Sequence, residues 1–436
     1  MSLVNPSSPD HVDAISFKSI IIETEISENV EIAAITTNLD VFEHLDKPYI
    51  TALLGFVDVE DIVGSMNISG GEKVRIVLKT NVEESLPVEK HFYIDKVVSS
   101  NKTNDNEEFF TLHLIEDYAF ISNTKNVNTV YSGKTSKIIE KIAKDSLDIE
   151  VDVNTKDLQE AKVIVPNLTP IDAMCWIKNR STTSDGYPLY LYSNFIDSNL
   201  QLNDLMTMMS AKVMNESEGR EFTHYESQAT SDLNISRRRI IMAYQAKNIN
   251  NLYSLIDKGL LGSEYRYLDI IKKEDHKFNF NVDKEVIKQL IDDNIIDTTP
   301  LYDSSRYDWS SSKINSRKIT RIGSTKVFSD QKSLSERDDA SQYRLNEVSH
   351  AMSQLLTTDA ISFVVNGIDF FDGEQSSTIG KKLRIRFLKN IITDEDDKFD
   401  HKKSGDYLIF ACKHSFTSRE YTLTFSGVKL SNGKVT

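Results

Sequence analysis

The chain of 436 residues contains only two cysteines, Cys175 and Cys412. Two thiols cannot form the disulfide framework of a small secreted domain or a cysteine-based zinc site. Each lies in an apolar run, so we expect both to be small core residues. No apolar run approaches the ~20 residues that span a bilayer, and residues 1–13 lack the apolar core of a signal peptide. We therefore expect a protein folded in a reducing cytoplasm, without membrane insertion.

Positive charge is also scarce, since 51 Lys and Arg stand against 66 Asp and Glu and give a net charge of −15. Binding of phosphates needs clustered Lys and Arg, which argues against a protein whose main task is to grip nucleic acid. The balance suits an ordinary soluble surface, or a surface past which DNA slides without sticking. The length predicts two to four domains.

The opening region, residues 15–120, has the pattern of a small antiparallel β-barrel. Short runs of alternating apolar residues are separated by turn residues such as Ser69-Gly70-Gly71. We expect strands at 20–25, 31–37, 50–58, 73–79, 92–98 and 109–115. Even spacing of short strands is typical of a barrel.

The next region is predicted to be a mixed α/β domain. Residues 136–147 place Ile138, Ile139 and Ile142 on one helical stripe. A second helix is expected to begin after Thr169, a good N-cap, with Pro170 at its first position. Further elements are expected to be strands at 187–192 and 199–202 and a helix at 283–296.

Polar composition dominates residues 303–339, which we predict to be a long loop or arm. The aromatic residues Tyr307 and Trp309 in this arm either pack locally or anchor a partner, because exposed aromatics often contribute most of an interface's energy. A second polar loop is expected at the acidic residues 393–404.

A weak internal duplication is the most informative pattern. Residues 71–79 resemble 380–388, residues 92–94 resemble 407–409, residues 110–114 resemble 421–425, and residues 51–56 resemble 362–366. Alternating strands resemble one another by chance, but four pairs in the same order indicate a duplicated barrel. Three such chains around a three-fold axis would give six similar barrels, a ring nearly six-fold in shape.

The chain resembles the central baseplate hub proteins of contractile-tailed, T-even-like phages, which are relatives of the hub part of type VI secretion spike proteins. The resemblance covers residues 17–430. It rests on the order of several weak motifs, namely Asp40-Val41-Phe42-Glu43, Gly70-Gly71-Glu72, Asn167-Leu168-Thr169-Pro170, Gly367 and Ile379-Gly380 before the strand at 383–387. None of these motifs is a catalytic signature.

The resemblance implies a mostly β, α+β protein with two similar small antiparallel β-barrels and a mixed α/β middle domain. The first barrel would span 15–120. The second would comprise 221–245 and 340–436, interrupted by a middle domain at 121–220 and 246–335. The family implies a homotrimer in the virion tail baseplate, assembled in the host cytoplasm. It would join the tail tube or a tube-initiator protein to the spike or needle, contact baseplate wedge proteins, and let DNA pass without specific binding.

Catalytic and cofactor motifs do not emerge. Gly133-Lys134-Thr135 lacks the upstream glycine of a phosphate-binding loop and is better read as a turn into a helix. The acidic run 394–397 lacks the glycine of a calcium loop. His91 and His113 lie on candidate strands of one barrel, where they either approach each other or are structural residues. We therefore expect no enzyme, no cofactor and no metal; a tail-associated cell-wall hydrolase and a carbohydrate-binding adhesin remain the alternatives.

Candidate interface residues follow from strand alternation and charge. Arg75, Val77, Arg384 and Arg386 would point outward from equivalent strands toward neighbouring subunits or the channel. Arg237 and Arg238 belong to the strongest basic cluster, which either solvates a strand end or pairs with an acidic surface nearby. Together with Tyr307 and Trp309 they are the residues expected to contact partners.

Overall fold

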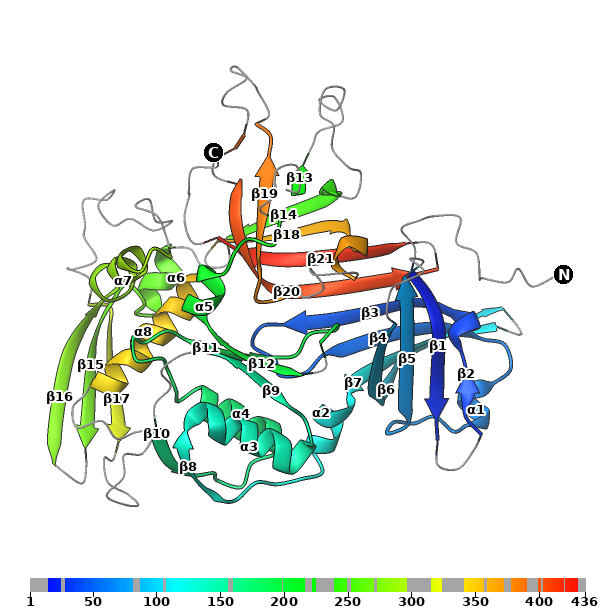
Figure 1. Ribbon diagram of the computed structural model, residues 1–436, viewed down its shortest axis with the longest axis horizontal. Coiled ribbons are helices and arrows are strands. Elements are labelled where there is room, and N and C mark those ends of the chain that lie inside the picture. The colour runs from blue at the N-terminus through cyan, green and yellow to red at the C-terminus, as the bar shows by residue number, and fades with distance from the viewer. Residues whose placement is uncertain are drawn as a thin grey trace.

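The structure is a computed structural model, and most of the chain is described in it. The described residues are 15–24, 28–80, 87–104, 107–155, 160–197, 199–215, 222–224, 239–248, 252–269, 273–295, 315–323, 341–356, 359–371, 378–389, 399–400, 403–418 and 420–429. The expected mostly β, α+β class is confirmed: long antiparallel strands cross the centre of the molecule, and helices lie to one side and below (Figure 1).

One large sheet dominates, with thirteen strands among the described residues. Its path runs through β14 (Ala243–Asn248), β18 (Asp359–Asn366), β21 (Tyr421–Val428), β20 (Gly405–Thr417), β3 (Thr36–His44), β4 (Thr51–Asp58), β7 (Glu107–Glu116), β6 (Val88–Asn104), β5 (Lys73–Thr80), β1 (Ile15–Glu23) and β2 (Val30–Glu31). Off this path, β19 (Lys382–Phe387) pairs with β20 and with β13 (Phe222–His224). Short helices α1 (Ile62–Ser65), η1 (Ala33–Ile35) and η6 (Ile368–Phe370) fill the connections.

The sheet has two halves with the same order of antiparallel pairing. The opening half is β3-β4-β7-β6-β5 with β1 and β2, and the closing half is β14-β18-β21-β20-β19 with β13. Val74 lies opposite Phe92 in the first, and Leu383 lies opposite Tyr407 in the second. A bulge also falls at the same point of each long strand, at 94–96 in β6 and at 409–411 in β20. The duplication seen in the sequence therefore extends to pairing order, register and bulge.

The predicted alignment of the halves is out by two residues at 110–114 and at the start of 51–56. When the shared bulges are superposed, Leu112 corresponds to Phe425. Leu54 pairs with Leu112 and Phe363 pairs with Phe425, so Leu54 corresponds to Phe363. The expected match had placed 110–114 on 421–425 and 51–56 on 362–366. Since side chains alternate with a period of two, such a slip keeps the same residues on the core face.

The halves also differ from the expected pair of separate barrels. They form one continuous sheet, because β20 pairs with β3, and no pairing among the described strands closes either half on itself. The outer strand differs too: β1 runs antiparallel to β5, whereas β13 runs parallel to β19.

A helical layer lies beneath the sheet in Figure 1 and has its own apolar core. Helices α2 (Asp117–Ser122), α3 (Thr135–Leu147) and α4 (Pro170–Lys178) pack with the pair β8 (Val130–Lys134) and β10 (Glu160–Ile164), and with the sheet of β11 (Leu189–Tyr192), β12 (Leu200–Asp204) and β9 (Val151–Asn154). The predicted stripe of α3 is buried. Thr169 caps α4 as predicted, since its side-chain oxygen accepts the Asp172 N–H. Gly133 and Lys134 end β8, paired with β10, and Thr135 begins α3, so the strand leads directly into the helix without the predicted turn.

A third group of elements lies at the left of Figure 1. It comprises the sheet of β16 (Glu274–Asn281), β15 (Gly262–Asp269) and β17 (Arg317–Gly323), with α5 (Leu205–Ser210), α6 (Leu252–Asp257), η3 (Asp283–Ile287), α7 (Lys288–Asp292) and α8 (Ser341–Leu356). None of the described helices is both long and apolar enough to cross a bilayer.

Two expectations for this region are wrong in detail. The predicted arm 303–339 contains β17, which pairs in parallel with β15. The helix expected at 283–296 is a π-type turn followed by α7, which ends at Asp292. Of the segment 221–245 expected in the second barrel, the described residues include β13 and the start of β14, and residues 225–238 lie outside the described residues.

Candidate functional site: the joint between the two halves of the sheet

The two halves meet where β20 pairs with β3, and we call this pairing the joint. It is antiparallel and runs from Ala411 opposite His44 to Thr417 opposite Asn38. On the same edge, the first residues of β20 pair with β19, while β21 occupies the other edge. Thus β20 pairs with its own half along most of its length through β21, and after the bulge at 409–411 its other edge pairs with β3 of the opening half.

A buried carboxylate, Glu43 of β3, lies at the centre of the joint. One of its oxygens accepts the backbone N–H of Phe195 and the other accepts the Thr378 hydroxyl. His414 Nε2 lies 3.1 Å from Glu43 Oε1, and both side chains are 0% exposed. Burial by itself raises the pKa of Glu43, but the His414 charge and the hydrogen-bond donors together outweigh it. The pKa of Glu43 is therefore below its usual value, and the carboxylate is ionised.

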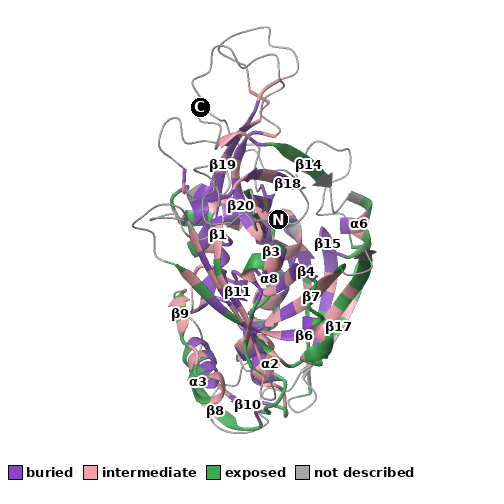
Figure 2. Ribbon diagram, turned by 90° about the vertical axis from the view of Figure 1, so that its right-hand side faces the viewer, coloured by how far each residue is buried: buried purple, intermediate pink, exposed green. Residues whose placement is uncertain are grey.

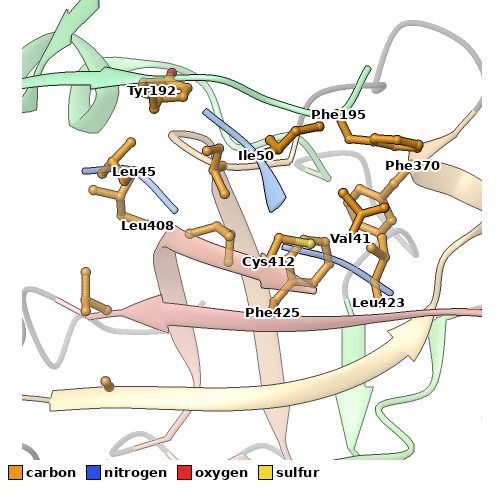
Figure 3. Close-up of a cluster of buried hydrophobic side chains, with 14 of the residues drawn as sticks. Val41, Leu45, Ile50, Tyr192, Phe195, Phe370, Leu408, Cys412, Leu423 and Phe425 are labelled. Carbon is orange, nitrogen blue, oxygen red and sulfur yellow. The ribbon is translucent and has the colours of Figure 1, made fainter. Parts of the chain in front are cut away.

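The His414 ring links this carboxylate to the closing half. Its Nδ1 lies 2.8 Å from the Tyr421 hydroxyl on β21. Burial raises the pKa of Tyr421 well above its usual value, so this phenol keeps its proton. The ring thus contacts the Tyr421 hydroxyl through Nδ1 and faces the Glu43 carboxylate through Nε2. The chain of contacts thus runs from β21 through β20 to β3, and Figure 3 shows the surrounding apolar side chains, among them Val41, Phe195 and Cys412.

A second buried cluster lies at the end of β7, around Glu116. Its oxygens accept the Ile50 N–H at 2.9 Å and the Ser193 hydroxyl at 3.3 Å, and one lies 2.8 Å from the Tyr118 hydroxyl. Lys90 Nζ is 3.6 Å from the carboxylate. Burial raises the pKa of Glu116, and the Lys90 charge and the hydrogen bonds only partly offset it.

Both clusters hold the same short segment, residues 193–197, which we call the bridging loop. Phe195 donates to Glu43, Ser193 donates to Glu116, and Lys90 Nζ donates to the carbonyls of Asn194 at 3.2 Å and Asp197 at 2.7 Å. The loop follows β11 of the helical layer. It is therefore fixed to the opening half directly and, through Glu43 and His414, to the closing half.

A further ion pair fastens the helical layer to the sheet. Lys178, near the end of α4, is buried and pairs with Asp46 in the turn after β3. An amine removed from water in this way is stabilised only while its partner remains. The sheet and the helical layer therefore share a polar, directional contact in addition to apolar packing.

Glu43, Cys412 and His414 place possible ligand atoms within 4.8 Å of one another, a spacing that a metal ion could bridge. Both Glu43 oxygens, however, already accept protein hydrogen bonds. Burial raises the pKa of Cys412 well above its usual value, so it stays a thiol and is a poor ligand. The hydrogen bonds of Glu43 and the protonated Cys412 thiol account for the proximity of these three side chains without a metal ion. The two cysteines are core residues as expected, Cys412 buried and Cys175 half-buried.

The predicted interface residues are only partly described. Arg75 and Val77 on β5 are half-buried, and Arg75 lies 3.6 Å from Glu89. Arg384 on β19 forms a two-pronged pair with Asp406, at 2.7 and 2.9 Å. The guanidinium of Arg386 lies 5.0 Å from the centre of the Phe399 ring. These four do not form one cluster but occupy equivalent strands.

The other predicted contacts, Arg237, Arg238, Tyr307 and Trp309, lie outside the described residues, as does the acidic run at 394–397. The two candidate structural histidines have separate partners. His91 lies 3.3 Å from Glu89, and His113 lies 2.9 Å from Asp95.

No protein-family model and no curated protein matches the chain. Solved structures do. The tail protein from Neisseria meningitidis MC58 aligns with a TM-score of 0.52 and 12% identity, covering 95% of this chain and 97% of that one. The 43 kDa tail protein of prophage MuSo2 from Shewanella oneidensis aligns with a TM-score of 0.52 and 11% identity, covering 94% and 98%. The chain has the fold of these two tail proteins.

A component of the type VI secretion system, the E. coli c3393 protein, aligns less well, with a TM-score of 0.46 and 8% identity over 94% of this chain and 77% of that one. A TM-score below 0.5 does not establish a shared fold. The tail-protein fold expected from the sequence is thus confirmed through the first two structures.

Proposed function

We propose that the protein is a structural hub subunit of a contractile phage tail or a related injection machine. It would act as a homotrimer in which three opening and three closing halves alternate around a channel. Such a ring is three-fold in sequence and nearly six-fold in shape, so it can join a six-fold tail tube to a three-fold spike or needle. In this proposal the protein belongs to the virion tail baseplate, is assembled in the host cytoplasm, and acts by shape rather than by catalysis.

One observation supports this proposal above the others. The two halves share pairing order, register and bulge, and they meet edge to edge through the joint. A chain that already presents two equivalent units side by side can present six such units when three copies assemble. The shared fold with two tail proteins supports the same conclusion.

The remaining parts of the proposal follow from the ring. We propose a first barrel at 15–120, a second at 221–245 and 340–436, and a middle domain at 121–220 and 246–335 that contacts spike or wedge proteins. Helix α8 packs against η3 of the middle domain, so within this proposal we move residues 341–356 from the second barrel to the middle domain. Arg75, Val77, Arg384 and Arg386 remain proposed ring contacts, and DNA would pass the acidic chain without specific binding.

The test is the mass and shape of the purified full chain. We expect light scattering to give about three times the chain mass of 49.6 kDa, and electron microscopy of the same sample to show a ring with six similar lobes. A chain that stays monomeric at high concentration, even with tube and spike proteins added, would refute the proposal. Release of soluble fragments from purified peptidoglycan by the chain alone would favour the cell-wall hydrolase instead.

A further inference from the structure

The long strands β6 and β20 are equivalent, yet their edges are used differently. The first residues of β6 pair with β5, and the first residues of β20 pair with β19. Each strand then continues past a bulge. Beyond the bulge, β20 pairs with β3, and its residues Cys412, His414 and Phe416 are buried. Beyond the corresponding bulge, no described strand pairs with that edge of β6.

The far part of β6, residues 96–102, is accordingly open to solvent. It pairs with β7 along one edge, Lys96, Ser100 and Lys102 are exposed, and Val98 is 50% exposed. An unpaired strand edge presents a row of backbone donors and acceptors that another strand can use.

Strand β14 presents the complementary edge. β14 pairs with β18, and β3 pairs with β4. Since β18 and β4 are equivalent strands of the two halves, β14 corresponds to β3. β3 has β20 on its second edge, whereas no described strand lies on the second edge of β14. Residues 243–246 are exposed, and Figure 2 shows β14 largely green.

We infer that β14 of one protomer pairs antiparallel with residues 97–102 of β6 of the next protomer, copying the joint between chains. This inference rests on the proposed function and names the surface through which the copies meet. The joint links an opening half to a closing half within a chain. The same pairing between chains would link the closing half to the next opening half, so that halves alternate around the ring.

The register follows from the joint. Ser100 corresponds to His414, because they lie opposite the equivalent residues Phe110 and Leu423. Ala246 corresponds to Val41, because they lie opposite Ile361 and Ala52. Since His414 lies opposite Val41, Ser100 is placed opposite Ala246 of the neighbour. By the same correspondence Asn101 is placed opposite Gln245.

A second copy is the occupant that this geometry favours. Strand β14 is at one end of the sheet path, and β6 lies beyond the joint on the other side, so the two edges do not meet within one chain (Figure 1). Each chain has one β14 edge and one β6 edge, so chains can join head to tail. Such a contact repeats from chain to chain and closes into a ring when the rotation between neighbouring chains is suitable. Extra bulges at 97–99 and 102–104 of β6 make its edge irregular, which disfavours unspecific addition of other strands.

Disulfide trapping in the full chain tests the register. We expect Ser100→Cys/Ala246→Cys and Asn101→Cys/Gln245→Cys to link most chains under mild oxidation, seen as reducible multimers on a denaturing gel. Directly opposed residues have Cα atoms roughly 4.5 or 5.5 Å apart, within the range a disulfide spans. The matched control Lys102→Cys/Ala246→Cys is two residues out of register and should remain unlinked, as should each single variant.

The outcomes separate this inference from the proposed function. If light scattering shows trimers but neither in-register pair is trapped, or the control links equally well, the chains meet through other surfaces and the inference is wrong while the hub proposal stands. If wild-type chains never assemble, the hub proposal and this inference fall together.

Discussion

Replacing Glu43 by Gln tests whether the buried carboxylate stabilises the joint. The ionised side chain accepts from Phe195 N–H and the Thr378 hydroxyl and faces His414. Gln keeps one accepting oxygen, but its NH₂ group is a donor. That group would face either the Phe195 N–H or the Thr378 hydroxyl, which are themselves donors to Glu43. The Thr378 hydroxyl can rotate to accept, but the backbone N–H cannot. Since a hydrogen bond to a charged group contributes about 1.5–3 kcal/mol, we expect the free energy of unfolding to fall by about 2–3 kcal/mol.

The assay is urea unfolding of the purified chain at neutral pH, followed by tryptophan fluorescence and circular dichroism. The midpoint should fall while the slope m stays constant. Asp40→Asn is the matched control, because Asp40 lies on the same strand and is 3.0 Å from Lys413 of β20, in a partly exposed pair. Such pairs contribute less than about 1 kcal/mol. Equal effects of the two substitutions would show that burial and hydrogen bonding at Glu43 do not matter, and the reasoning would fail.

The pH dependence of the same variant provides a second check. The pKa of Glu43 is below its usual value in the folded chain. Its ionisation therefore stabilises the fold at pH above the carboxyl pKa of the unfolded chain, and this contribution is lost as the pH falls through the folded pKa. We expect the gap between wild type and Glu43→Gln to be largest near neutral pH and to shrink in acid. A gap that grows in acid would contradict the assigned direction.

Three further predictions concern other sites. Burial raises the pKa of Glu116, so the folded state favours its protonated form; Glu116→Gln should gain stability relative to wild type as the pH rises from about 4 to 7 in urea unfolding, and a parallel pH profile would contradict this. Thr169→Ala removes the cap of α4 and should cost about 1 kcal/mol, with Thr169→Ser as the variant that keeps it. Gly367→Ala would place a Cβ 2.4 Å from the buried Tyr421 ring, and this overpacking should lower stability by about 1–3 kcal/mol. An unchanged melting temperature would contradict that crowding.

Local patterns predicted the elements that depend on neighbours along the chain. The helix of α3 follows from apolar residues three and four apart, and the start of α4 follows from a cap and a proline. The duplication could also be found, because strand alternation and turn spacing repeat in order. Helix α8 was missed, although Val348, Ala351 and Met352 are buried at helical spacing. The family resemblance had assigned residues 340–436 as a whole to the second barrel.

The joint could not be predicted in the same way. Glu43 and His414 are far apart in the chain and carry no motif, and the bridging loop is an ordinary polar turn in the sequence. Only pairing of β3 with β20 places the carboxylate and the imidazole together away from water. A strand such as β6 similarly gives no sign of which part of its edge will remain unpaired, because an edge is a property of the sheet.

The sequence alone determined that the chain repeats a set of strands, which faces of those strands turn inward, and where helices α3 and α4 begin. These features follow from side-chain periods of two and of 3.6 residues, which are local. Tertiary structure decided that the repeats join into one continuous sheet, that buried charges fasten the bridging loop to both of them, and that two strand edges are left without a partner among the described residues. Those features depend on which distant segments meet, and the hydrogen bonds and desolvation that fix them arise only on contact.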